Sequence, residues 1–178
     1  MRTERQAAGT FLRVADPSWE DPFDGSFSMR RGQRWNAKGS FPVVYLNANE
    51  ATAQANAVRL LERLAAVGVE AEDLEDAELP VILECAMPPR VVLDVLSDEG
   101  CLDAGLGTTY PLGPDGQLVG HERCQPIGQS AWDAGLDGIA CRSAALPGPE
   151  GEELAWLDRP GKRLAPAGPP RPLQPGRP

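Results

Sequence analysis

Glycine and proline are spread along this chain and limit how long its helices and strands can be. The sequence contains 19 glycines and 18 prolines in 178 residues, and both residue types interrupt regular elements and favour turns. A chain of this length suffices for one compact domain but is too short for two. The sequence therefore predicts a single domain in which short elements are joined by long loops.

The clearest predicted helix spans residues 50–67. Asn49 is placed to act as its N-cap, and Gly68 stands where a helix commonly ends. Its apolar residues recur at helical spacing: Ala53, Ala57, Leu60, Leu61 and Leu64. This spacing puts them on one stripe that can face a core. A second, shorter helix is expected over residues 125–134.

Short runs rich in β-branched or apolar residues predict the strands. These runs lie at residues 11–14, 41–46, 80–87, 90–96, 137–142 and 153–157. Pro88-Pro89 is expected to break the chain between two of them. Because the strands and helices do not follow βαβ order, the sequence predicts an α+β domain with a mixed, mostly antiparallel sheet and few helices.

Both ends of the chain are predicted to lie outside this domain, which we expect over residues 10–160. Residues 1–9 are polar and expected to be flexible. Residues 161–178 form a proline-rich tail that is expected to be disordered, since six of the last 14 residues are proline. Inside the domain, residues 70–78 carry six acidic side chains, which is typical of a solvated connector.

Composition excludes several classes of partner. The formal net charge of −9 argues against nucleic acid, whose binders need a basic surface to displace counterions. No N-terminal run resembles a signal peptide, and no stretch approaches the roughly 20 apolar residues of a spanning helix. We therefore expect a cytoplasmic protein with no membrane partner. One histidine is present, and no metal site is expected because no zinc-binding spacing relates the four cysteines, Cys85, Cys101, Cys124 and Cys141.

The motifs of several enzyme classes are absent. The sequence has no P-loop, no G-x-G-x-x-G and no G-x-S-x-G elbow. With a single histidine, His121, far from any serine motif, a Ser-His-Asp hydrolase is not expected. Arginine, tyrosine, tryptophan, asparagine and serine remain, and these side chains suit an anionic, aromatic, nucleotide-like ligand.

The segment Arg30–Gly39 concentrates four basic residues, one tryptophan and two glycines. Arginine forks match phosphate oxygens in pairs, indole stacks on rings, and glycine lets the backbone approach a ligand. Two interpretations remain open at this point. The segment is either a local anion site, or a basic turn with Trp35 anchored in the core.

Four further side chains are candidates, each with a structural alternative. Asn56 lies at the edge of the apolar stripe, so its amide either satisfies a buried backbone group or faces a pocket. Tyr45 ends a predicted strand and is either a core tyrosine or a ligand contact. Ser143 follows a strand and is otherwise an exposed turn residue. Arg13 lies on the first predicted strand and otherwise forms a surface salt bridge.

The sequence resembles the RES domain family over roughly residues 10–157. The resemblance is carried by Phe11–Val14, by Arg34-Trp35-Asn36 with Gly39, by Val43–Leu46 and the alanine-rich helix after it, and by Gly138–Ala144. It implies a fold similar to ADP-ribosyltransferase toxins. It also implies cleavage of the nicotinamide–ribose bond of NAD by phosphorolysis, hydrolysis or ADP-ribosyl transfer. NAD would be a substrate, with phosphate as one acceptor, and no cofactor is implied.

The resemblance also implies roles for individual residues. The family arginine falls on Arg34, the tyrosine on Tyr45 and the serine on Ser143, with Arg13 as a further arginine. Trp35 and Asn36 are expected to bind substrate beside Arg34. The family glutamate falls on position 56, where this chain has Asn56. An amide can orient a ribose hydroxyl, but it brings no negative charge to a developing oxocarbenium ion.

Three functions are therefore open from the sequence. The first is an NAD-degrading enzyme acting as a bacterial toxin, for which the resemblance implies an Xre-type antitoxin partner. The second is an NAD- or nucleotide-binding protein that has lost turnover through Asn56. The third is a site that has changed to another nucleotide or sugar-phosphate reaction.

Overall fold

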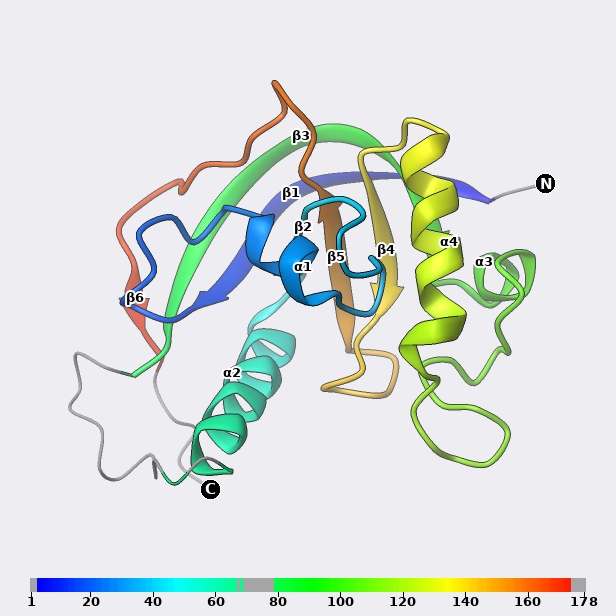
Figure 1. The fold of residues 1–178 in the computed structure, drawn as a ribbon, viewed down its shortest axis with the longest axis horizontal. Helices are drawn as coiled ribbons and strands as arrows, with labels where there is room; N and C mark the ends of the chain where they lie inside the picture. Colours follow the sequence, from blue (N-terminus) through cyan, green and yellow to red (C-terminus); the bar gives the residue numbers. More distant parts are fainter. Residues whose placement is uncertain (1–2, 67, 69–78, 174–178) are drawn as a thin grey trace.

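The computed structural model describes residues 3–66, 68 and 79–173 (Figure 1). The predicted acidic connector over residues 70–78 lies outside the described residues. In chain order the elements are β1 (Glu4–Ala15), α1 (Ser26–Arg31), β2 (Val43–Asn47), α2 (Glu50–Ala65), β3 (Val81–Val95), α3 (Asp98–Asp103), α4 (His121–Asp133), β4 (Gly138–Arg142), β5 (Glu152–Leu157) and β6 (Arg171–Pro172).

The strands form one sheet in the order β1-β2-β5-β4-β3-β6. β1 also pairs with β3 along most of its length, so β1, β2, β5, β4 and β3 close into a ring. The short strand β6 pairs with the first two residues of β3. The β3–β4 pair is parallel and the other pairs are antiparallel. The predicted α+β domain with a mixed, mostly antiparallel sheet is confirmed.

Two predictions about the long strands are wrong. Glu4 to Gly9 belong to β1 and pair with β3, so the predicted flexible N-terminus is ordered from Glu4 onward. β3 also runs through Pro88-Pro89 without a break. Its register with β1 shifts by one residue between Ala7 and Gly9, opposite the two prolines. This bulge accommodates two residues that lack an N–H donor, so the strand continues.

The helices follow the local signals in the sequence. α2 ends at Ala65, and Asn49 Oδ1 accepts a hydrogen bond from the Thr52 backbone N–H at 2.9 Å, as expected of an N-cap. α4 begins at His121, four residues earlier than predicted, and contains Pro126. Two short helices, α1 and α3, lie in segments for which no helix was predicted.

The predicted disorder of the tail is wrong for residues 161–173. Arg171 and Pro172 pair with β3, and the Ala167 backbone N–H donates to Glu84 O at 2.7 Å. The Leu173 side chain is buried against α2 and β1. The folded domain therefore extends beyond the predicted boundary at residue 160, because a short apolar anchor can hold a proline-rich segment on a sheet edge.

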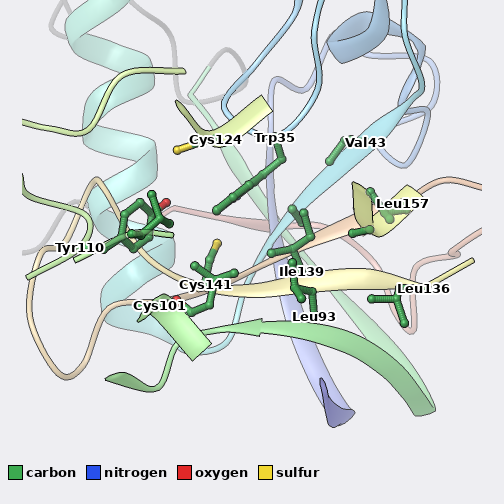
Figure 2. Close-up of a cluster of buried hydrophobic side chains, with 14 of the residues drawn as sticks. Trp35, Val43, Leu93, Cys101, Tyr110, Cys124, Leu136, Ile139, Cys141 and Leu157 are labelled. Carbon is green, nitrogen blue, oxygen red and sulfur yellow. Dashed lines mark hydrogen bonds between the residues drawn. The ribbon is translucent and has the colours of Figure 1, made fainter. Parts of the chain in front are cut away.

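The core has three parts around the ring of strands. One lies between the arch of β1 and β3 and the strands β2, β5 and β4, and includes Phe11, Cys85 and Trp156. The second lies between the sheet and α2. The third, drawn in Figure 2, lies between β4, β5, α3 and α4 and contains Trp35 and Tyr110. In Figure 1, α1 lies in front of the central strands and α4 runs beside β4.

Candidate functional site

A cavity of about 470 Å³ lies where α1, α2, β1, β2 and the start of β5 meet. Its volume is within the range of small-molecule sites. Five of its lining residues bear on chemistry: Arg13, Arg34, Tyr45, Asn56 and Glu153. Four of these were predicted from the sequence, so residues spread over more than 40 positions of the chain are brought to one place by the fold.

Charges of both signs line the cavity. Its four arginines are Arg13, Arg30, Arg34 and Arg59. Its four carboxylates are Glu20, Asp21, Asp24 and Glu153. Two of these arginines, Arg30 and Arg34, come from the Arg30–Gly39 segment, for which one interpretation predicted a local anion site. The carboxylates also give the cavity negative charge, which can face a cationic group in the same ligand.

Arg34 is positioned by the loop that follows α1. Gly32 ends the helix with a φ of 74°, a conformation that favours glycine and turns the chain toward α4. Arg34 Nη1 then donates to the Val119 carbonyl at 2.8 Å and contacts Cys124 Sγ at 3.9 Å. Both contacts use Nη1, and a guanidinium has five N–H donors. Arg34 therefore keeps donors for an anion in the cavity.

Trp35 and Asn36, which the sequence predicted to contact substrate, are fully buried and are not among the residues that line the cavity. The Trp35 ring lies in the core 6.0 Å from the ring of Tyr110, and Figure 2 shows it among core side chains. Asn36 Nδ2 donates to the Phe41 carbonyl at 2.9 Å. The core-anchor interpretation therefore holds for Trp35, while the neighbouring Arg34 reaches the cavity.

Tyr45 lines the cavity and also contacts the loop that carries Trp35 and Asn36. Its hydroxyl accepts a hydrogen bond from the Trp35 backbone N–H at 3.2 Å and lies 3.5 Å from Asn36 Oδ1. Burial raises the pKa of Tyr45 above its ordinary value. The phenol is therefore neutral at physiological pH and acts as a hydrogen-bonding group rather than as a base.

Arg13 is half-buried, and it forms no salt bridge with any residue that the structure describes. Its Nε donates to the Pro22 carbonyl and its Nη1 to the Tyr45 carbonyl, each at 2.9 Å. Its guanidinium lies 5.3 Å from the centre of the Trp19 ring. Burial lowers the pKa of Arg13 to about 10, so it stays charged at neutral pH. It fixes the loop after β1 against β2 and contributes positive charge to the cavity.

Asn56 faces a cluster of polar side chains. Its Nδ2 donates to Asn47 Oδ1 at 2.8 Å and to Glu153 Oε1 at 2.9 Å. The pocket interpretation of Asn56 is therefore correct, and its partners are side chains rather than a buried backbone group alone. Asn47 and Glu153 are direct cross-strand neighbours in the β2–β5 pair, so the sheet register brings both to α2.

Ser143 is fully buried, which contradicts its interpretation as an exposed turn residue. Its hydroxyl lies 2.5 Å from Glu153 Oε1. Ser143 Oγ also accepts hydrogen bonds from the backbone N–H groups of Ala145 and Leu146. Ser143 therefore contacts the carboxylate of Glu153, which lines the cavity, and holds the loop between β4 and β5.

Glu153, like its cross-strand neighbour Asn47, is a residue of this cluster that the sequence interpretation missed. It is half-buried, lines the cavity, and accepts hydrogen bonds from both Asn56 and Ser143. One signal was available, since a carboxylate directly precedes the apolar run Leu154–Leu157 in a predicted strand. Its partner Asn56 is 97 residues away, and only the strand order brings the two together.

Within residues 3–66, 68 and 79–173, no group of three histidine, cysteine or acidic side chains is arranged to hold a metal ion. All four cysteines are free and buried. Among the described helices, none combines the length and the apolar character needed to cross a bilayer.

Comparison with known proteins places this geometry in context. The family model described as RES domain matches residues 10–174. No curated protein matches the chain significantly. Among solved structures, the chain is similar to the crystal structure of the M. tuberculosis MbcT–MbcA toxin–antitoxin complex, with a TM-score of 0.70 and 23% sequence identity. The alignment covers 97% of this chain and 87% of the matched chain, so the likeness shows a shared fold.

Proposed function

The chain belongs to the RES domain family, and from that premise we propose that it cleaves the bond between nicotinamide and ribose in NAD. The observation that carries the proposal is the composition of the cavity. Two cationic side chains, Arg13 and Arg34, line it together with the carboxylate of Glu153 and the amide of Asn56. NAD has the matching pair of charges, because its pyrophosphate is anionic and its nicotinamide ring is cationic.

Each side chain has a role in this proposal. Arg34 binds the pyrophosphate or an incoming phosphate, since guanidinium groups match such oxygens in pairs. Tyr45 contacts the nicotinamide ribose, and Asn56 orients its hydroxyls. Nicotinamide leaves with the electron pair of the C–N bond and is then neutral. No strong general acid is needed at the leaving group, which suits a cavity whose cationic side chains are mainly arginines.

The test is direct. The purified chain is incubated with NAD, with and without inorganic phosphate, and nicotinamide release is followed by chromatography. We expect release by the native chain, a strong loss in Arg34→Ala, and no loss in Arg123→Ala. Arg123 is an exposed arginine that does not line the cavity. Absence of release by the native chain at high concentration would refute the proposal.

The acceptor is identified in the same experiment. If phosphate is the acceptor, a phosphorylated ADP-ribose forms only when phosphate is present, whereas hydrolysis gives ADP-ribose in both reactions. Label that stays on the protein after incubation with NAD labelled in the adenosine moiety identifies ADP-ribosyl transfer. A native chain that binds NAD but releases no nicotinamide would instead be the second alternative, an NAD-binding protein that has lost turnover through Asn56.

We also propose that the chain acts as the toxin of a toxin–antitoxin pair. The support is family membership together with a fold shared with a chain of the MbcT–MbcA toxin–antitoxin complex. Induced expression in a bacterial host is expected to lower cellular NAD and stop growth. Co-expression of a small protein encoded beside this gene is expected to restore both. Unchanged NAD and growth at high expression would contradict the toxin role.

A further inference from the structure

Glu153 lies at a position where a carboxylate is costly unless the fold makes use of it. It is on β5, which is flanked by β2 and β4 in the sheet, and it pairs in register with Asn47 on one side and Cys141 on the other. The next four residues of β5 are buried apolar side chains. A half-buried carboxylate next to such a core loses hydration and requires hydrogen bonds in exchange.

Neutral groups supply those hydrogen bonds. Ser143 Oγ lies 2.5 Å and Asn56 Nδ2 lies 2.9 Å from the same oxygen, Oε1. Among the described residues, no arginine or lysine forms a salt bridge with Glu153, and no donor is assigned to Oε2. The two donors therefore fix the orientation of the carboxylate without cancelling its charge, and the second oxygen is left for the cavity that Glu153 lines.

Asn56 connects this geometry to the family resemblance. Position 56 on α2 is where the resemblance places a glutamate, and this chain has an amide there. The amide nitrogen lies 2.9 Å from the Glu153 carboxylate on β5. The negative charge missing from the helix is therefore supplied by the adjacent strand, within one hydrogen bond of the expected position.

We propose that Glu153, oriented by Ser143 and Asn56, is the carboxylate of this site and stabilises positive charge on the nicotinamide–ribose portion of the ligand. The inference rests on the proposed NAD cleavage. As the C–N bond breaks, its electron pair leaves with nicotinamide, and the positive charge moves to the ribose ring. Glu153 opposes that charge electrostatically and forms no bond to the sugar. A phosphate or water oxygen then bonds to the anomeric carbon, and a proton from attacking water passes to solvent.

The first experiment measures turnover of a charge-neutral variant. Glu153→Gln keeps the shape and one acceptor oxygen, so the fold is expected to survive, which thermal unfolding checks. We expect kcat to fall by about 10²–10³-fold, as when one transition-state electrostatic contact is removed. Glu152→Gln, one residue away and not lining the cavity, is expected to leave kcat unchanged. Full activity in Glu153→Gln would overturn the inference.

The second experiment moves the charge back to the helix. The double variant Asn56→Glu, Glu153→Gln exchanges carboxylate and amide across the hydrogen bond that links them. We expect it to recover at least about tenfold of the lost kcat, because the charge again lies beside the same part of the ligand. A folded double variant that is no more active than Glu153→Gln would show that Glu153 acts through some property other than its charge.

The third measurement separates this inference from the proposed function. Carba-NAD⁺ resists cleavage because a methylene replaces the ribose ring oxygen, and its reduced form lacks the pyridinium charge. The native chain is expected to bind the oxidised form roughly tenfold more tightly or better, and Glu153→Gln is expected to lose that preference. If the native chain releases no nicotinamide but shows this pattern, the proposed cleavage fails and the role of Glu153 stands. An unchanged preference in the variant, or no binding of either form, overturns the inference.

Discussion

The Ser143 hydroxyl and the Glu153 carboxylate lie 2.5 Å apart, across the loop that joins β4 to β5. The same hydroxyl accepts two backbone N–H groups of that loop, so one buried side chain fixes both the loop and the carboxylate. We infer that this residue, which resembles a catalytic serine in sequence, is a positioning residue, because it does not line the cavity and its hydroxyl contacts Glu153, which does.

Ser143→Ala tests this positioning role. Two backbone donors lose their acceptor in a half-buried part of the loop, so we expect the free energy of unfolding to fall by about 1 kcal/mol. We also expect kcat for nicotinamide release to fall while KM for NAD changes little, since Ser143 does not line the cavity. Urea unfolding and steady-state kinetics measure the two effects. A higher KM with normal kcat would mean that the hydroxyl contacts NAD directly.

Tyr45→Phe tests whether the phenol works as a hydrogen-bonding group. The change removes the acceptor of the Trp35 backbone N–H, and we expect about 0.5–1.5 kcal/mol less stability. Burial raises the pKa of Tyr45, so its deprotonation is not expected to shape activity between about pH 6 and 10. The pH profiles of native and variant proteins should therefore share one shape. An alkaline limb that disappears in the variant would contradict this.

Gly128→Ala tests the close contact between α4 and the loop that carries Arg34. A Cβ at position 128 would lie 1.7 Å from the Trp35 carbonyl oxygen, so the helix or the loop must move. We expect about 1–3 kcal/mol of destabilisation together with weaker NAD binding through Arg34. Gly168→Ala is the matched control, because a Cβ there meets nothing within 4 Å. Equal stability of the two variants would show that the contact relaxes freely.

Leu173 and Arg171 make different contributions to holding the C-terminal segment on the domain. Arg171 forms two hydrogen bonds of 2.6 and 2.7 Å with the Glu50 carboxylate, but both side chains are exposed, so Arg171→Ala should cost at most about 1 kcal/mol. Leu173 is buried against α2, so Leu173→Ala should cost about 2–5 kcal/mol. Denaturant unfolding ranks the two, and the reverse order would mean that the ion pair holds the segment.

Elements that depend on local signals were predicted correctly from the sequence. Predictions failed for elements whose extent depends on contacts with distant segments. α2 was predicted within two residues of its observed end because its cap at Asn49 and its apolar stripe are both local. β3 was predicted as two strands because its continuity through the bulge at Pro88-Pro89 depends on pairing with β1, about 80 residues earlier.

The candidate site follows the same division. Arg34, Tyr45 and Asn56 were predicted because their types and spacing lie within one stretch of chain, and the structure brings them to one cavity. Trp35 was expected to contact substrate because its immediate neighbours are charged, whereas its burial depends on α4 and Tyr110. Glu153 was missed because its partners come from β4 and α2, and sheet register cannot be deduced from one sequence.

Asp94 links the stability of the domain to pH. Its side chain is buried at the end of β3, and its carboxylate accepts hydrogen bonds from the Leu96 and Ser97 backbone N–H groups at 2.8 and 3.1 Å and from the Ser97 hydroxyl at 2.8 Å. Burial alone would raise the pKa of Asp94, but these three hydrogen bonds outweigh it and hold the pKa below its ordinary value.

Because the folded pKa of Asp94 is lower than the unfolded one, its contribution to stability is present above about pH 4 and is lost as pH falls through the folded pKa. Asp94→Asn removes the charge, so we expect it to lower the free energy of unfolding by about 1–3 kcal/mol at pH 7. The gap between native and variant proteins should narrow as pH falls from about 4 through the lower folded pKa, below which the native carboxyl is neutral as well. Urea unfolding at pH 7 and at a pH below the folded pKa of Asp94 measures the gap. A gap of equal size at the two pH values would mean that the shape of the side chain, and not its charge, stabilises the turn after β3.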